Sequence, residues 1–142
     1  MTLLFHHIQQ LSRTVNQYLN EGLVQEDIYM SHWAVIYQLG ENGRMTQAEL
    51  KERLNIEAPP LSRTIKKLIK LGYVEKWASD DRRTNDLQLS AEGKENYPRW
   101  KSLIQEQENG LLTLFDEDQL MEFEERIHHF SQTIKTRGKN VE

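Results

Sequence analysis

Apolar residues recur every three or four positions in two long stretches of the chain. The first runs from about residue 3 to 21, with apolar positions at Leu4, Ile8, Leu11, Val15 and Tyr18. The second follows Asp116, with apolar positions at Leu120, Phe123, Ile127, Phe130 and Ile134. Steps of three and four place such residues on one face of an α-helix. We therefore expect two amphipathic helices whose apolar faces need a partner, with Asp116 as the N-cap of the second.

The middle of the chain has shorter elements with clear start and stop signals. A helix is predicted over Ser31–Leu39, because the Gly-Glu-Asn-Gly run at residues 40–43 is typical of a helix end. Thr46 and Glu49 then form a capping-box pattern, in which each side chain accepts a hydrogen bond from a backbone N–H left unpaired at a helix start. This pattern predicts a short helix over residues 47–54.

Another helix is predicted only three residues further on, over residues 58–71. Pro59 and Pro60 suit its first turn, where the backbone N–H groups have no intrahelical partner, and Gly72 suits its end. A helix, a three-residue turn and a second helix have the spacing of a helix-turn-helix.

The second helix of this pair is amphipathic in an unusual way. One face carries the apolar residues Leu61, Ile65, Leu68 and Ile69. The opposite face carries the basic residues Arg63, Lys66, Lys67 and Lys70. No acidic residue occurs between Ala58 and Leu71. One face is therefore expected to lie in the core and the other to be available to a negatively charged partner.

The periodicity changes after Gly72. Residues 73–77 and 86–89 are typical of two strands, and the polar segment 78–85 between them contains Arg82 and Arg83. This is the pattern of a β-hairpin with a basic turn. A long helix is expected from Ser90 onward, bearing Tyr97, Trp100, Ile104 and Leu111.

Charge is distributed unevenly along the 142 residues, whose net charge is -4. Residues 44–83 contain ten Lys or Arg and six Asp or Glu, so a basic middle lies between acidic ends. There is no Cys, which excludes disulfides, thiolate metal sites and cysteine nucleophiles. No apolar run is long enough to span a bilayer, and no signal-peptide pattern is found, so we expect a cytoplasmic protein without a membrane partner.

A helix-turn-helix followed by a basic hairpin is a winged helix-turn-helix, and both parts suit duplex DNA. The second helix fits the major groove, and arginines of the hairpin suit the negative potential of a minor groove. The alternative is a winged helix that serves only as a protein-interaction module without direct DNA binding, which the acidic total charge favours. No nucleophile elbow, phosphate loop or paired-carboxylate motif is present, so we expect no enzyme activity.

Residues 46–93 resemble the winged-helix core of the MarR family of bacterial transcription regulators, particularly its SlyA-like members. The resemblance is carried by IEAPPLSRT at residues 56–64, Leu71-Gly72, DDRR at residues 80–83 and LQLSAEG at residues 87–93. It implies a single MarR-type domain over residues 1–142, mainly α-helical with a small β-hairpin wing. The winged core spans about residues 44–93, and the dimerisation helices span about residues 1–21 and 91–136.

The resemblance also implies a homodimeric repressor that binds a pseudo-palindromic operator and is released by a small, often aromatic, effector. The DNA contacts expected on these grounds and from the basic face are Thr46, Gln47, Pro59, Ser62, Arg63, Lys66, Lys67, Arg82 and Arg83. Asp81 is expected to brace the wing turn, and the sequence does not distinguish which of Arg82 and Arg83 enters the minor groove.

Aromatic rings and histidines are the remaining candidates for ligand binding. Trp33, Tyr37 and Trp100 are candidate effector-binding residues, although core packing explains these rings equally well. Neither a cofactor nor a metal site is expected, because the histidine pairs at residues 6–7 and 128–129 are adjacent in sequence and do not share a helix face.

Overall fold

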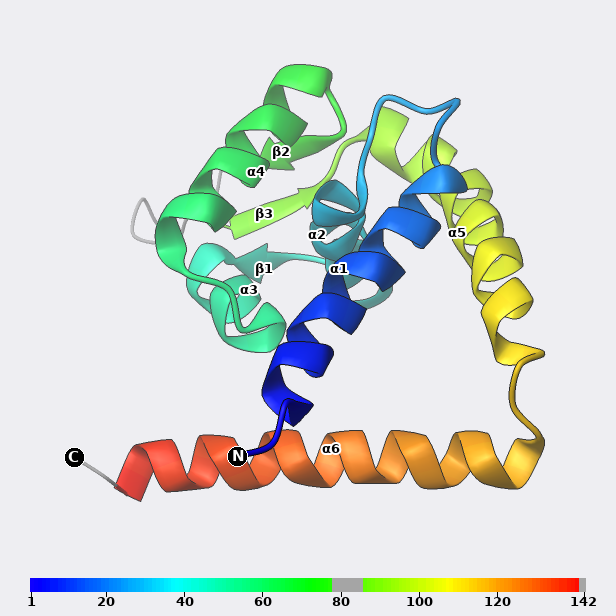
Figure 1. The fold of residues 1–142 in the computed structure, drawn as a ribbon. Helices are drawn as coiled ribbons and strands as arrows, with labels where there is room; N and C mark the ends of the chain where they lie inside the picture. Colours follow the sequence, from blue (N-terminus) through cyan, green and yellow to red (C-terminus); the bar gives the residue numbers. More distant parts are fainter. Residues whose placement is uncertain (78–85, 141–142) are drawn as a thin grey trace. The chain divides into compact units, whose positions relative to one another are not determined.

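The structure of the protein is a computed structural model that describes residues 1–77 and 86–140. Residues 1–107 form one compact unit, and the chain from residue 108 onward forms a second. The elements follow one another along the chain as Figure 1 shows. They are α1 (Leu4–Glu21), α2 (Met30–Asn42), β1 (Met45–Thr46), α3 (Gln47–Leu54), α4 (Ala58–Leu71), β2 (Val74–Lys76), β3 (Asp86–Leu89), α5 (Ala91–Leu112) and α6 (Glu117–Asn140).

The helix-turn-helix forms as its local signals predict. At the start of α3, Thr46 Oγ1 accepts a hydrogen bond from Glu49 N (3.1 Å), and Thr46 N donates to Glu49 Oε1 (3.2 Å). The capping box is therefore confirmed. Helix α3 ends at Asn55, whose φ of 54° is left-handed, and α4 ends at Gly72, whose φ is 87°. Glycine takes that conformation without a steric penalty, which explains the stop.

The strands form a small antiparallel sheet in the order β1-β3-β2. Leu87 of β3 lies opposite Met45 on one side and Lys76 on the other, and Leu89 lies opposite Val74. The two hairpin strands were predicted, but β1 was not. A strand of two residues is too short to show alternation, and its pairing partner lies about forty residues further along the chain.

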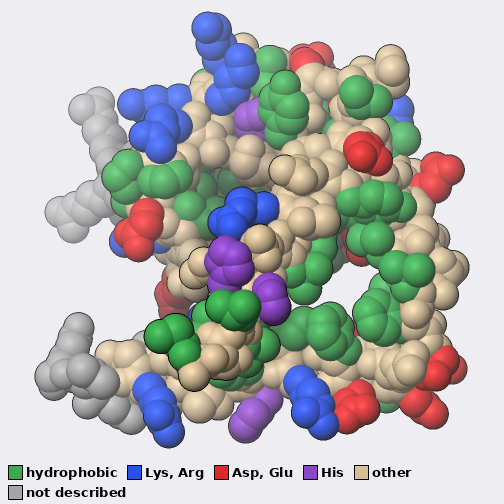
Figure 2. Space-filling view, viewed as in Figure 1, with side chains coloured by type: hydrophobic (Ala, Val, Ile, Leu, Met, Phe, Trp, Pro, Cys, Tyr) green, Lys and Arg blue, Asp and Glu red, His purple; other side chains and the backbone are tan. Residues whose placement is uncertain are grey.

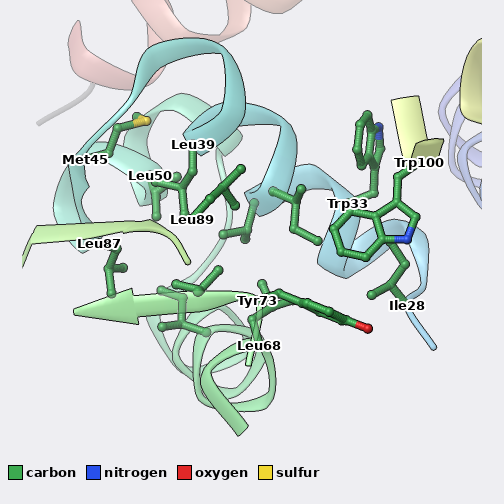
Figure 3. Close-up of a cluster of buried hydrophobic side chains, with 14 of the residues drawn as sticks. Ile28, Trp33, Leu39, Met45, Leu50, Leu68, Tyr73, Leu87, Leu89 and Trp100 are labelled. Atoms are coloured by element: carbon green, nitrogen blue, oxygen red, sulfur yellow. The ribbon is translucent and has the colours of Figure 1, made fainter. Parts of the chain in front are cut away.

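The core of the first unit lies where α2, α4 and α5 meet the inner face of the sheet, as Figure 3 shows. Buried side chains come from every one of these elements. They include Val35, Ile36 and Leu39 of α2, Leu50 of α3, Leu61, Ile65 and Leu68 of α4, Met45, Val74, Leu87 and Leu89 of the sheet, and Trp100 and Ile104 of α5. The predicted apolar face of α4 is thus the face that the core covers.

The boundaries of two helices differ from the prediction. Helix α2 continues through Gly40 to Asn42 and ends at Gly43, three residues later than expected. A Cβ atom at Gly40 would overlap the ring of Tyr97, so this glycine makes room for an aromatic side chain of α5 and does not end the helix. Helix α6 runs to Asn140, beyond the expected end near residue 136.

The second unit contains the end of α5 and the whole of α6. Asp116 caps α6 as expected, because its Oδ1 accepts a hydrogen bond from Gln119 N (2.8 Å), and Gln119 Oε1 accepts one from Asp116 N (3.1 Å). The rings of Phe115 and Phe123 stack with their centroids 5.6 Å apart. The apolar face of α6 stays exposed, with Ile127 and Ile134 each 53% exposed.

Candidate nucleic-acid interface

The exposed side of α4 is a continuous basic surface. Arg63, Lys66, Lys67 and Lys70 are all exposed, whereas Leu61, Ile65 and Leu68 on the other side are buried. We call these four cations the basic face of α4. Figure 2 shows Lys and Arg side chains gathered over this helix. Because the apolar side is fixed in the core, the helix presents its cations in a defined orientation.

A hydrogen bond between side chains joins the two helices of the helix-turn-helix. Gln47 Nε2, in the first turn of α3, donates to Ser62 Oγ of α4 over 2.7 Å. Both residues are among the DNA contacts predicted from the sequence, but nothing in the sequence indicates that they are partners, since fifteen positions separate them. The Ser62 hydroxyl accepts this bond, so its own O–H remains a donor. The bond holds the start of α4 against α3.

The remaining expected contacts lie near that junction or in the wing. Thr46 is the N-cap of α3, and Pro59 is exposed in the first turn of α4. The hydrogen bond between Gln47 and Ser62 links the α3 end of this junction to α4. The expected contacts at Arg82 and Arg83, and the expected brace at Asp81, lie outside the residues that the structure describes.

A buried histidine lies behind the basic face. His32 of α2 is only 8% exposed, and its Nδ1 accepts a hydrogen bond from Tyr29 N over 2.9 Å. Burial lowers the pKa of His32 below its ordinary value, and the charge of Lys67 lowers it further, while Asp27 acts in the opposite direction. Neutral His32 therefore serves as an acceptor that caps α2. The sequence shows no sign of this role.

The loop before α2 is tied to the core by carboxylates. The hydroxyl of Tyr73 donates to both oxygens of Asp27, over 2.8 and 2.9 Å. Burial and this carboxylate raise the pKa of Tyr73 to about 12, so the tyrosine stays neutral. Glu26 Oε1 accepts from Trp100 Nε1 (2.9 Å) and from Arg99 Nη2 (2.7 Å) of α5. These bonds hold α5 on the winged core.

The three candidate effector-binding rings pack against other aromatic residues. The Trp33 ring centroid lies 5.8 Å from that of Tyr37 and 5.6 Å from that of Tyr97, with which it stacks. Trp100 is fully buried, and its ring packs in a T-shaped arrangement against that of Tyr73, with the centroids 4.8 Å apart. The hydroxyl of Tyr97 donates to Glu41 over 2.6 Å, and burial together with that carboxylate raises its pKa.

The part of the chain that the structure describes contains neither a metal-binding cluster nor a membrane-spanning helix. Within residues 1–77 and 86–138, no group of three or more His, Cys, Asp or Glu side chains is placed to hold a metal ion. None of the helices that the structure describes is both long and apolar enough to cross a bilayer.

The fold is that of solved MarR structures. A mutant of MarR from E. coli, crystallised in complex with operator DNA, superimposes with a TM-score of 0.82 at 22% identity, over 89% of this chain and 92% of that one. A MarR transcriptional regulator from Methanosarcina mazei Go1 gives 0.79 at 24% identity, over 94% and 91%. NadR in complex with 4-hydroxyphenylacetate gives 0.79 at 20% identity, over 94% and 98%. At these identities the likeness shows the fold.

Sequence similarity adds the family. The model of the winged helix DNA-binding domain matches residues 30–93. The chain is 35% identical over 120 residues to YwoH, an uncharacterized HTH-type transcriptional regulator of Bacillus subtilis (strain 168), which covers 84% of this chain and 82% of the relative. The chain belongs to the MarR family of transcriptional regulators. The family resemblance and the fold class read from residues 46–93 are thereby confirmed. In this MarR-family regulator, α4 is the second helix of the helix-turn-helix, and the β2–β3 hairpin is the wing.

Proposed function

We propose that the protein is a homodimer that binds duplex DNA sequence-specifically and represses transcription by occluding promoter DNA. The observation that carries this proposal is the basic face of α4, four exposed cations on a helix whose opposite side is locked in the core. Phosphates attract such a surface, and the helix has the diameter that a major groove admits. The operator DNA in the complex of the E. coli MarR mutant supports the same use of the fold.

Different side chains would position the protein and read the sequence. Lys66 and Lys67 are point charges suited to phosphates, whereas the forked guanidinium of Arg63 suits a guanine edge. At the start of the two helices, the side chains of Thr46, Gln47, Pro59 and Ser62 would meet the DNA backbone or base edges. Arg82 and Arg83 would reach an adjacent minor groove, with Asp81 bracing the turn that carries them.

The dimer would bury the apolar faces that each unit leaves exposed. On α1, Leu4, Ile8 and Leu11 are 50%, 42% and 48% exposed. On α6, Ile127 and Ile134 are exposed to a similar extent. Rows of large apolar side chains of this kind mark an association surface more often than a solvent face. A two-fold dimer would present two α4 helices to a pseudo-palindromic site with half-site centres roughly 10 bp apart.

A small aromatic effector would release the DNA. NadR, which shares the fold, was crystallised in complex with 4-hydroxyphenylacetate, and this supports an effector of that chemistry. Trp33, Tyr37 and Trp100 remain the proposed contacts. An effector would have to displace some of the aromatic packing that these rings make now. As a regulator of transcription, the protein would act in the cytoplasm and would catalyse no reaction.

The salt dependence of binding to duplex DNA tests the proposal. Lys67→Ala should weaken binding to all duplexes and make the slope of log K against log salt shallower by roughly 1.8 per dimer, since each lost phosphate contact contributes about 0.9. Lys94→Ala is the matched control, because Lys94 is an exposed lysine of α5 and does not belong to the helix-turn-helix. Salt-independent association, or equal effects of the two variants, would favour a protein-interaction module instead.

A further inference from the structure

A cationic side chain and an indole meet on the outward face of the sheet. Arg44 immediately precedes β1, and Trp77 immediately follows β2. The Cζ atom of Arg44 lies 4.0 Å from the centroid of the Trp77 ring. A guanidinium at this distance over an indole face is a cation–π contact. Thirty-three positions separate the two residues, so sequence periodicity gives no sign of the pair.

The register of the sheet explains which face carries this contact. Met45, Val74, Leu87 and Leu89 are buried, so their side chains lie on the inner face. Because side chains alternate along a strand, the neighbours Arg44, Glu75, Trp77 and Gln88 lie on the outward face. On that face Gln88 Nε2 donates to Glu75 Oε1 over 2.7 Å, which links β3 to β2. Trp77 remains 39% exposed there.

The contact joins the two edge strands, which share no hydrogen bonds. The strand order is β1-β3-β2, so β1 and β2 pair only with β3. Arg44 belongs to the β1 edge and Trp77 to the β2 edge, and their side chains meet across the central strand. Neighbouring strands lie about 4.8 Å apart, so the two edge strands are separated by twice that spacing. An arginine is one of the few side chains long enough to reach from one edge strand toward the other. We name the pair the Arg44–Trp77 clasp.

The clasp lies at the base of the wing. Trp77 N donates to Asp86 O over 2.8 Å, which closes the pair of strands at that end. The chain enters the segment 78–85 directly after Trp77 and leaves it at Asp86, and that segment contains Arg82 and Arg83. The other end of the clasp adjoins β1, which leads without a break into α3 and so belongs to the helix-turn-helix. The clasp therefore connects the wing to the helix-turn-helix, which contains α4.

We propose that Arg44 is a positioning residue, which holds the base of the wing against β1 so that the wing arginines and α4 engage DNA together. This inference rests on the proposed DNA binding. A direct phosphate contact by Arg44 is the competing role. The outward face disfavours it, since strand alternation places the acidic residues Glu75 and Asp86 on the same face, and the indole covers one side of the guanidinium.

The first test needs no DNA. Amide hydrogen exchange is measured at Trp77, whose N–H bonds Asp86 O, in the wild type and in Arg44→Ala, Arg44→Lys and Trp77→Phe. Loss of the clasp in Arg44→Ala should speed the exchange, and the two conservative variants, which keep a cation over a ring, should exchange more slowly than Arg44→Ala. Identical exchange in Arg44→Ala and the wild type would overturn the proposal, because the clasp would then hold nothing.

The second test is a double-mutant cycle on operator affinity, measured where every variant is fully folded. Arg44→Ala should lower affinity severalfold in the wild type and should have little effect once Arg82→Ala and Arg83→Ala are present, since no wing arginine remains to be positioned. Arg44→Lys should restore part of the loss. Lys94→Ala controls for removal of one positive charge.

The outcomes separate this inference from the proposed function. Equal losses from Arg44→Ala in both backgrounds would show a direct phosphate contact and overturn the positioning role. If the wild type itself bound no duplex, the proposed function would fail, and the hydrogen-exchange result would still decide whether the clasp exists.

Discussion

Protonation of His32 should destabilise the fold at mildly acidic pH. Its Nδ1 accepts the N–H of Tyr29 at the start of α2, so the imidazole must be neutral for that bond to exist. The side chain is 8% exposed, and Lys67 of α4 adds a like charge that disfavours the imidazolium. Asp27 is the one described group that favours the charged form. Burial and Lys67 together keep the pKa of His32 below its ordinary value.

The direction of the change in stability with pH follows from the protons that the folded and unfolded states bind. In the unfolded chain a histidine binds its proton near pH 6.5, whereas the folded protein binds it only at lower pH. The unfolded state therefore carries more protons just below pH 6.5, and stability falls as the pH falls through that range. The free energy of unfolding should drop by at most about 1.4 kcal/mol per pH unit and per chain. Well above pH 6.5, His32 is neutral in both the folded and the unfolded state and contributes no pH dependence to the stability.

The assay is urea unfolding at pH 7.5 and pH 5.5, at one fixed protein concentration. The matched variant is His32→Gln, whose amide oxygen keeps an acceptor for Tyr29 N without titrating. It should match the wild type at pH 7.5 and exceed it at pH 5.5. His32→Ala should be less stable than His32→Gln by about 0.5–1.5 kcal/mol at both pH values, because it removes the acceptor altogether and neither variant titrates at this position. The other four histidines are common to all three proteins, so parallel pH profiles for the wild type and His32→Gln would refute the reasoning.

Three further predictions concern reading, assembly and packing. Arg63→Ala should cost about 1–3 kcal/mol of operator binding per subunit and relax base preference, whereas Lys67→Ala should weaken binding to operator and random DNA alike. Competition binding with both duplexes measures this, and an equal loss of affinity for both from Arg63→Ala would contradict the prediction. Ile127→Glu should yield a helical monomer by sedimentation, and a stable dimer would exclude α6 from the interface. Leu50→Ala, at a fully buried position, should lower the free energy of unfolding by about 2–5 kcal/mol, and a loss below about 1 kcal/mol would mean that the site collapses.

The elements that the sequence predicts are those with local causes. The capping box of Thr46 and Glu49, the left-handed stop at Gly72 and the cap at Asp116 each involve residues within a few positions of one another. The amphipathic pattern of α4 likewise depends only on helical spacing. Such features are visible in a single sequence because the atoms that make them are neighbours in the chain.

The features that the sequence does not predict depend on contacts between distant residues. Gly40 resembles a helix stop, yet α2 passes through it, because the ring of Tyr97 occupies the space where a side chain would lie. Gln47 and Ser62, and likewise Arg44 and Trp77, are distant in the sequence and come into contact only in the folded chain. The candidate DNA contacts on α4 were predictable as a face, whereas the bonds that hold that face in place were not.

The apolar faces proposed for the dimer interface also divide into a part that the sequence predicts and a part that it does not. The spacing of apolar residues in α1 and α6 predicts two helices with one apolar side each, and the structure leaves Leu4, Ile8, Ile127 and Ile134 exposed. What covers them is a property of the assembly and is not written in the periodicity of one chain.

Selection of genomic DNA fragments by the purified wild-type protein tests the central claim most directly. Fragments retained at physiological salt are sequenced, and the protected bases are mapped by footprinting. A two-fold dimer that inserts two α4 helices should enrich fragments sharing a pseudo-palindrome, with protected half-sites centred roughly 10 bp apart. Retention of fragments with no common sequence, or protection of a single half-site, would contradict sequence-specific binding by a symmetric dimer.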